Sequence, residues 1–177
     1  MEEERRKKLE PWLKEDDKKS FDYRMERLDF LEKEFGKGRS ILFFGTTPGM
    51  AFDEARLTYL NGLYVSCILI TEAIIEQSFA GMFYAAGNNE VAKHGYRKVI
   101  EKAYRENWID DEDYRTLVSI NTRRNSLVHF RSPGDNRHPM YQATSEGKDF
   151  WDMVQDDAKT ILSVLFRMLA RSPFRGA

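Results

Sequence analysis

The chain is poor in the residues that crosslink small proteins or bind metals. It has one cysteine and three histidines among 177 residues. A single cysteine excludes an internal disulfide, and no Cys/His group has metal-ligand spacing, so we expect neither a metal nor another cofactor. Cys67 lies in an apolar run, which predicts a small buried side chain rather than a nucleophile. A chain of this length buries enough apolar surface to fold without such crosslinks.

The sequence also lacks a long apolar run. Residues 1–12 contain no apolar stretch of the kind that a secretory signal needs. The longest apolar run, residues 63–71, ends at Glu72 and is far shorter than the roughly 20 residues of a membrane-spanning helix. We therefore expect a soluble, cytoplasmic protein without a membrane partner.

An excess of charge of one sign is missing as well, because 28 basic residues face 29 acidic ones. Net charge averages over local patches, however, and the placement is uneven. Residues 1–19 hold fourteen charges, seven of each sign, which predicts a solvated charged helix or arm. Residues 20–177 are expected to form a single domain. Within them, residues 122–137 carry four arginines and one aspartate, a local charge of +3.

Apolar residues recur at three- and four-residue spacing through most of the chain, which is typical of amphipathic helices. The pattern predicts helices over residues 20–35, 52–86, 90–106, 110–130 and 145–170. Gly62 inside the longest of them predicts a close helix approach or a small bend. Residues 41–44 are expected to form an apolar loop over the core, and residues 131–139 a turn-rich loop. The fold class is therefore all-α, a mostly antiparallel helical bundle of four to five core helices.

One segment combines residues suited to phosphodiester chemistry. Asn125 and His129 are four positions apart and are expected to share a helix face, where Arg124 can swing beside the imidazole. An imidazole moves protons near neutral pH, and a guanidinium holds phosphate oxygens and offsets developing charge. The same spacing also arises by chance, and Arg or His near a helix C-terminus favours the helix dipole without any catalysis.

The hexapeptide Arg124-Asn125-Ser126-Leu127-Val128-His129 resembles the R-x(4–6)-H motif of HEPN domains, including their form with Asn directly after Arg. The helix order is also similar over residues 50–170, with a long early helix, a later motif-bearing helix, a loop and a final helix. The resemblance implies a HEPN-like bundle and a metal-independent endoribonuclease acting as a homodimer, in a toxin–antitoxin, phage-defence or RNA-processing system. The implied reaction is attack of the ribose 2′-hydroxyl on the adjacent phosphate, leaving a 2′,3′-cyclic phosphate.

The resemblance also implies roles for individual residues. Arg124 and His129 would form the catalytic pair, and Asn125 would position it. Active members often add a polar residue from the long helix, for which Glu72 and Glu76 are the candidates. Each glutamate is alternatively a solvated edge of the apolar stripe.

The implied partner is RNA, and the basic segment supplies candidate contacts in Arg123, Arg131 and Arg137. Toxins that pair with a nucleotidyltransferase antitoxin carry Tyr two positions after the motif His, where this chain has Arg131. Regulation through that tyrosine is therefore not expected, although an antitoxin or nucleotidyltransferase partner remains compatible with the resemblance.

Two alternatives stay open. The first is a catalytically inactive HEPN domain that binds a nucleotide, RNA or a protein partner. The second is a helical-bundle interaction protein in which the motif is coincidental. The joint presence of Arg124, Asn125 and His129 favours the nuclease over the inactive domain.

Overall fold

The described part of the chain is helical throughout. The computed structural model describes residues 2–35 and 46–170, and these residues form eight helices and no strand. The chain divides into two compact units, residues 1–37 and residues 38–177. The predicted all-α fold class is confirmed.

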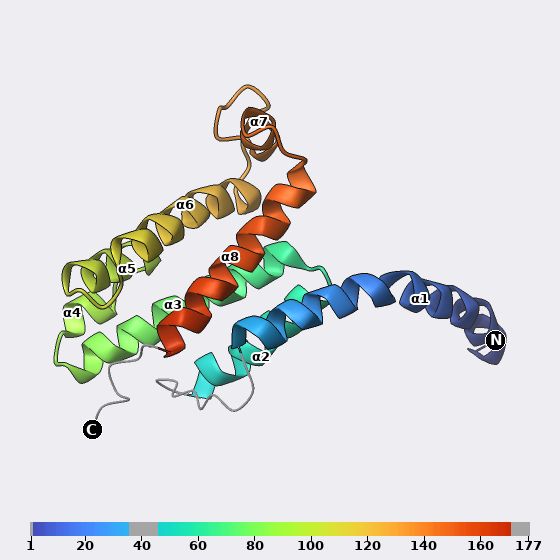
Figure 1. Cartoon of the computed structure of the whole chain (residues 1–177), viewed down its shortest axis with the longest axis horizontal. Helices are drawn as coiled ribbons and strands as arrows, with labels where there is room; N and C mark the ends of the chain where they lie inside the picture. The colour runs from blue at the N-terminus through green and yellow to red at the C-terminus, as the bar shows by residue number, and fades with distance from the viewer. Residues whose placement is uncertain (1, 36–45, 171–177) are drawn as a thin grey trace. The chain divides into compact units, whose positions relative to one another are not determined.

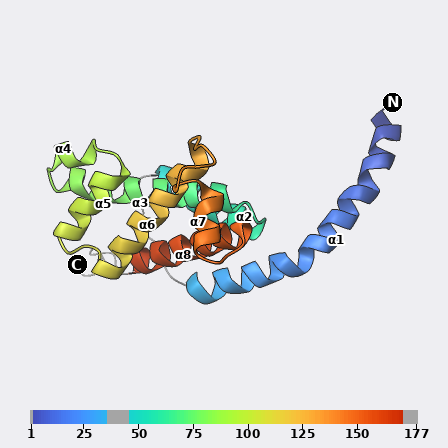
Figure 2. The same ribbon diagram turned by 90° about the horizontal axis from the view of Figure 1, so that it is seen from above.

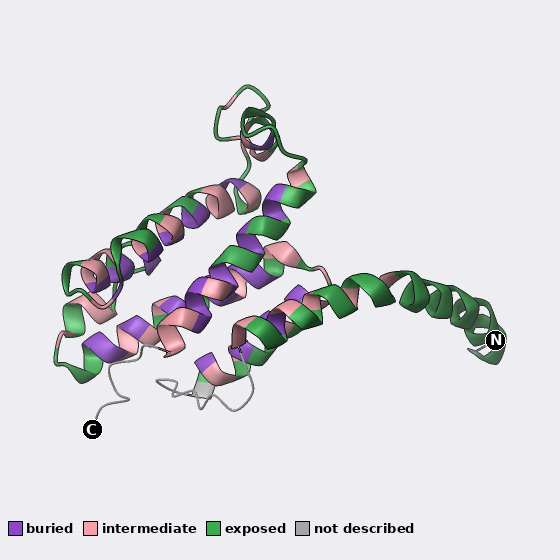
Figure 3. Cartoon of the chain, viewed as in Figure 1, coloured by how far each residue is buried: buried purple, intermediate pink, exposed green. Residues whose placement is uncertain are grey.

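The first unit is built on one long helix, α1 (Glu2–Phe35). Most of its side chains are exposed, as Figure 3 shows. Ion pairs one turn apart line the helix, among them Lys14–Glu10 at 2.7 Å. Such exposed pairs each add only a few tenths of a kcal/mol. The helix continues through residue 19, where the sequence predicted the border between a charged arm and the domain, and the units divide after residue 37 instead.

The second unit is a bundle in which neighbouring helices mostly run antiparallel (Figure 1). Its helices are α2 (Thr46–Leu60), α3 (Tyr64–Ala85), α4 (Asn89–Ala92), α5 (Tyr96–Arg105), α6 (Asp111–Val128), α7 (Pro139–Ser145) and α8 (Phe150–Ala170). Helix α3 is central, because it packs against α2, α5, α6 and α8. The short α7 contacts α6 and α8, and Figures 1 and 2 place it at the end of α6 and the start of α8.

The core of this unit consists mainly of aliphatic and aromatic side chains from α3 and α8. Each of these helices buries nine residues. The most completely buried large side chains on the two helices include Phe83, Ile74, Ile75, Ile161, Leu162 and Leu165. Burying a side chain of this size contributes about 1.5–3 kcal/mol, so the α3–α8 contact is a main source of stability.

The single helix predicted for residues 52–86 is in fact two helices, α2 and α3. Gly62 adopts a left-handed conformation with φ of +75° between them. The Leu63 N–H donates to the Thr58 carbonyl at 2.8 Å and the Gly62 N–H donates to the Tyr59 carbonyl at 3.0 Å. These two bonds form a Schellman motif, a helix end that favours glycine because it has no Cβ. The chain then reverses, and α2 and α3 pack side by side.

Other predicted boundaries also differ. The helix predicted over residues 90–106 is divided into α4 and α5, and the one predicted over residues 145–170 begins only at Phe150, after Gly147 with φ of +67°. Pro139 opens α7 instead of ending the loop. The apolar loop predicted at residues 41–44 lies outside the described residues.

Helix α3 is long and apolar enough to span a membrane by length and composition alone. The central helix of a soluble bundle meets the same criteria, and α3 buries nine residues within the protein. The expected soluble character and the cytoplasmic location both stay predictions.

Candidate active site

Helix α6 carries the motif as far as Val128, and the two ends of this helix differ in structure. Asp110 caps the start, where its side chain accepts the Asp113 N–H at 2.8 Å. The helix ends at Val128, and His129 has extended backbone angles of −117° and 134°. The expectation that Asn125 and His129 share a helix face is therefore wrong. The His129 N–H still donates to the Asn125 carbonyl at 3.1 Å, and the His129 side chain is exposed.

Arg124 points toward α3, where it forms an ion pair with Glu72. Its Nε and Nη2 both bond to Glu72 Oε2. Asn121 donates to the other oxygen of Glu72 at 3.1 Å, and the Arg124 Nη1 donates to Asn125 Oδ1 at 2.9 Å. Glu72 is only 2% exposed. The structure thus unites Glu72, Arg124 and Asn125, and for Glu72 the alternative of a solvated stripe edge is wrong.

Burial makes the charge of Glu72 costly. It raises the pKa of the Glu72 carboxyl above its ordinary value, and the neighbouring Arg124 and Asn121 oppose that rise. Glu76, one turn further along α3, is half-buried and adds a smaller repulsion that also raises this pKa. Glu76 therefore influences the cluster through the electrostatic effect of its charge, whereas Glu72 contacts Arg124 directly.

Tyr96 is a member of this environment that the sequence did not reveal. It lies at the start of α5 and is 6% exposed, and its hydroxyl has no hydrogen-bond partner among the described residues. Burial raises the pKa of Tyr96 well above its ordinary value, and the charge of Glu72 raises it further. Only the packing of α3, α5 and α6 brings this hydroxyl near the ion pair, so helical periodicity gave no signal for it.

We expect Tyr96→Phe to raise the free energy of unfolding by about 1 kcal/mol, because it removes a buried hydroxyl that makes no bond. Urea denaturation measures the change. Tyr104→Phe on the same helix is the matched control, since its exposed hydroxyl donates to Asp111 at 3.2 Å. A larger loss of stability in Tyr96→Phe than in Tyr104→Phe would contradict this prediction.

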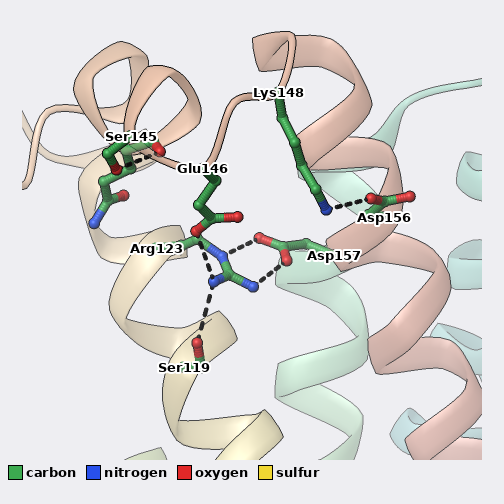
Figure 4. A network of polar contacts seen from close by, with 8 residues as sticks. Ser119, Arg123, Ser145, Glu146, Lys148, Asp156 and Asp157 are labelled. Carbon is green, nitrogen blue, oxygen red and sulfur yellow. Dashed lines mark hydrogen bonds and ion pairs between the residues drawn. The ribbon is translucent and has the colours of Figure 1, made fainter.

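Arg123 belongs to a separate network that joins α6 to α8 (Figure 4). Its Nε donates to Asp157 Oδ2 at 2.7 Å, and its Nη2 bonds to the other oxygen of Asp157. Its Nη1 donates to Ser119 at 3.2 Å and lies 3.6 Å from Glu146. Burial raises the pKa of Asp157, and Arg123 opposes that rise. Arg123 therefore joins α6 to α8, and its contact with RNA stays a prediction.

Two further arginines lie in the loop after α6. Arg137 pairs with Asp135 at 2.8 Å, and its hydrogen bonds lower the pKa of Asp135 to about 2. Arg131 is half-buried and forms no ion pair within the described residues. The local charge of +3 is therefore largely compensated by carboxylates from other helices or from the same loop.

The remaining sequence predictions concern metals and cysteine. Within the described ranges, no group of three or more His, Cys, Asp or Glu side chains is arranged to hold a metal ion. Cys67 is completely buried in α3, and burial raises the pKa of its thiol to about 12. A thiol of that pKa carries almost no thiolate at neutral pH, as expected for a structural cysteine.

Comparison with known proteins finds no relative. No family model, no curated protein and no solved structure matches the chain. The resemblance to HEPN domains therefore stays an expectation from the sequence, and the function drawn from it is a proposal.

Proposed function

We propose that the protein is a metal-independent endoribonuclease of the HEPN type that cleaves RNA through attack of the 2′-hydroxyl, in a toxin or phage-defence system. The observation that carries the proposal is the anchoring of Arg124. A coincidental R-x4-H on a surface needs no buried acid, whereas Arg124 is held by Glu72 from a helix 52 residues earlier in the chain. Preorganised cations of this kind stabilise charge that develops during reaction.

His129 supplies the proton transfer in the proposed reaction. Its exposed imidazole takes the proton of the ribose 2′-hydroxyl as the oxygen attacks phosphorus. The bond from phosphorus to the 5′-oxygen breaks and that oxygen takes up a proton from water, while the His129 imidazolium returns its proton to the solvent, so the products are a 2′,3′-cyclic phosphate and a 5′-hydroxyl. Arg124 offsets the added negative charge on the phosphate oxygens, and Asn125 fixes the guanidinium through its 2.9 Å bond.

The proposed assembly is a homodimer in which both motifs face one cleft. An exposed His129 at the end of α6 leaves room for RNA and for a second copy. Partners beyond RNA, such as an antitoxin or a nucleotidyltransferase, belong to the same proposal.

We expect the purified protein to cleave RNA in the presence of EDTA, and His129→Ala to lower the rate by about 100-fold or more. Removal of a general acid–base group accounts for this factor. Gel analysis of a labelled RNA, with detection of cyclic-phosphate ends, measures it. Because His129 is exposed, the substitution should leave the unfolding midpoint nearly unchanged.

His94→Ala is the matched control, since His94 is also exposed but precedes α5, away from the motif helix. Equal cleavage by the wild type and by His129→Ala would reject His129 as the catalytic group. Cleavage that requires an added divalent ion would reject the metal-independent mechanism.

A catalytically inactive HEPN domain is the second candidate, and one observation favours it. Within the described residues Arg124 bonds to Glu72 and Asn125, and no bond joins it to His129. Wild-type protein that binds RNA without cleaving it, in EDTA or in magnesium, would support this candidate over the nuclease.

A further inference from the structure

A surface pocket of about 470 Å³ lies beside His129, at the junction of α6, α7 and α8. The pocket is lined by the end of α6, by the following loop and by the first residues of α7 and α8. Its volume is within the range of pockets that hold small molecules. The pocket belongs entirely to the second unit, so one chain forms it alone.

The polar lining of the pocket consists of side chains that can donate hydrogen bonds to an anion. Besides His129 it includes His138 and Arg131. Among the described residues, the Nε of Arg131 is buried without a hydrogen-bond partner, although an arginine nitrogen buried in this way normally has one. The Nδ1 of His138 accepts the Met140 N–H at 3.3 Å, which leaves Nε2 as the ring nitrogen available to a ligand. All three side chains favour an anion over a cation.

The rest of the lining is apolar. Phe130 is 90% exposed and Met140 is 55% exposed, and Phe150 contributes from the start of α8. An aromatic ring this exposed next to cationic groups matches the way proteins hold single-stranded nucleic acids, with a base stacked on a ring and a phosphate on basic side chains.

We propose that this pocket is the subsite for one nucleotide of the RNA, with the phosphate against Arg131 and His138 and the base against Phe130 and Met140. The inference rests on the proposed function, because His129 on the pocket wall is the group assigned to the adjacent bond. It assigns roles to His138, Phe130 and Met140, which the motif does not contain. Substrate selection then depends on the loop after α6 and on α7.

The three histidines make the test direct. Two of them line the pocket, and the third, His94, lies between α4 and α5. We would titrate protein labelled at histidine with adenosine 3′-monophosphate and follow the ring signals by NMR. The ring signals of His129 and His138 are expected to shift while that of His94 does not.

Substitutions identify the contacts. Arg131→Gln is expected to weaken adenosine 3′-monophosphate binding by about tenfold or more, through loss of charge-assisted hydrogen bonds. Arg97→Gln on α5 is the matched control and should bind as the wild type does, since Arg97 is exposed and lies outside the pocket lining. His138→Asn removes the ring but keeps a residue that caps α7 well, so its loss of affinity would reflect lost contact.

Three probes separate the possible ligands. The nucleotide should bind more tightly than inorganic phosphate and than adenosine, and a dinucleotide blocked by a 2′-O-methyl group should bind more tightly still. Equal affinity for phosphate and nucleotide would overturn the base contact. Equal affinity for the mononucleotide and the dinucleotide would overturn the assignment to RNA in favour of a free nucleotide.

Absence of any shift at His129 and His138 would overturn the pocket assignment itself, even if RNA is cleaved. Conversely, nucleotide-induced shifts at both rings in a protein that cleaves no RNA would support the pocket while rejecting the nuclease. The two proposals therefore fail separately.

Discussion

Arg124→Ala is expected to lower the free energy of unfolding by about 3 kcal/mol at neutral pH. The substitution leaves the Glu72 carboxylate, which is 2% exposed, with Asn121 as its remaining hydrogen-bond donor. An isolated buried charge costs more than the surface pairs elsewhere on the molecule contribute. Urea denaturation at pH 7 measures the loss.

This loss should shrink as the pH falls. Burial already raises the pKa of Glu72 in the wild type, and Arg124 is the largest opposing influence, so its removal raises the pKa further. A raised carboxyl pKa means that the folded state binds the proton more tightly than the unfolded state, and stability then decreases as the pH rises through this range. Arg124→Ala should therefore recover part of its stability in mildly acidic solution, where Glu72 becomes protonated.

Arg115→Ala is the matched control on the same helix. Arg115 pairs with Asp111 at 2.9 Å, but its side chain is 77% exposed, so the expected change is at most about 0.5 kcal/mol. A second control adds Glu72→Gln to Arg124→Ala, which removes the unpaired charge and should restore part of the stability. Equal effects of Arg124→Ala and Arg115→Ala, or no rescue by Glu72→Gln, would contradict a buried, anchoring ion pair.

Asp157→Ala is expected to cost about 2–3 kcal/mol, the second largest effect. The Asp157 carboxylate bonds to two nitrogens of Arg123 and joins α8 to α6 (Figure 4). The substitution removes the carboxylate partner of Arg123, whose side chain is only 22% exposed. Glu146 remains 3.6 Å away and offsets part of the loss. Thermal or urea unfolding measures the change.

Asp156→Ala supplies the control at the neighbouring position. Asp156 pairs with Lys148 at 2.7 Å, but the side chains are 56% and 42% exposed, so its loss should be near zero. Similar stabilities of the two variants would show that the Arg123–Asp157 contact does not hold α6 to α8. A loss of stability in Asp157→Ala alone would show that Arg123, which lies in the basic segment, stabilises the fold.

The helical character and the position of the motif could be predicted because their signals are local. Periodic apolar residues indicated α5, α6 and α8, and the acidic residues at the start of α6 are those that a helix N-terminus favours. The division between α2 and α3 was missed, although Gly62 was recognised as unusual. Its left-handed conformation ends α2, whereas the continuous apolar pattern on both sides suggested one helix.

The chemistry of the basic segment was less predictable, because four arginines that look alike in sequence have different tertiary surroundings. Arg123 pairs with Asp157, 34 residues away in the sequence, and Arg124 pairs with Glu72, 52 residues away. Arg137 pairs with Asp135 in its own loop. The orphan hydroxyl of Tyr96 and the place of His138 in the pocket also required the packed helices.

Local sequence patterns were enough to predict a helical bundle and to place an Arg, an Asn and a His near the end of one helix, because helix periodicity and spacing act over a few residues. Which charges are neutralised depends on the folded chain, since ion pairs form between helices that are far apart in the sequence. The tertiary structure also decided that His129 leaves the helix and faces a pocket, which depends on how the loop and α7 pack against α8.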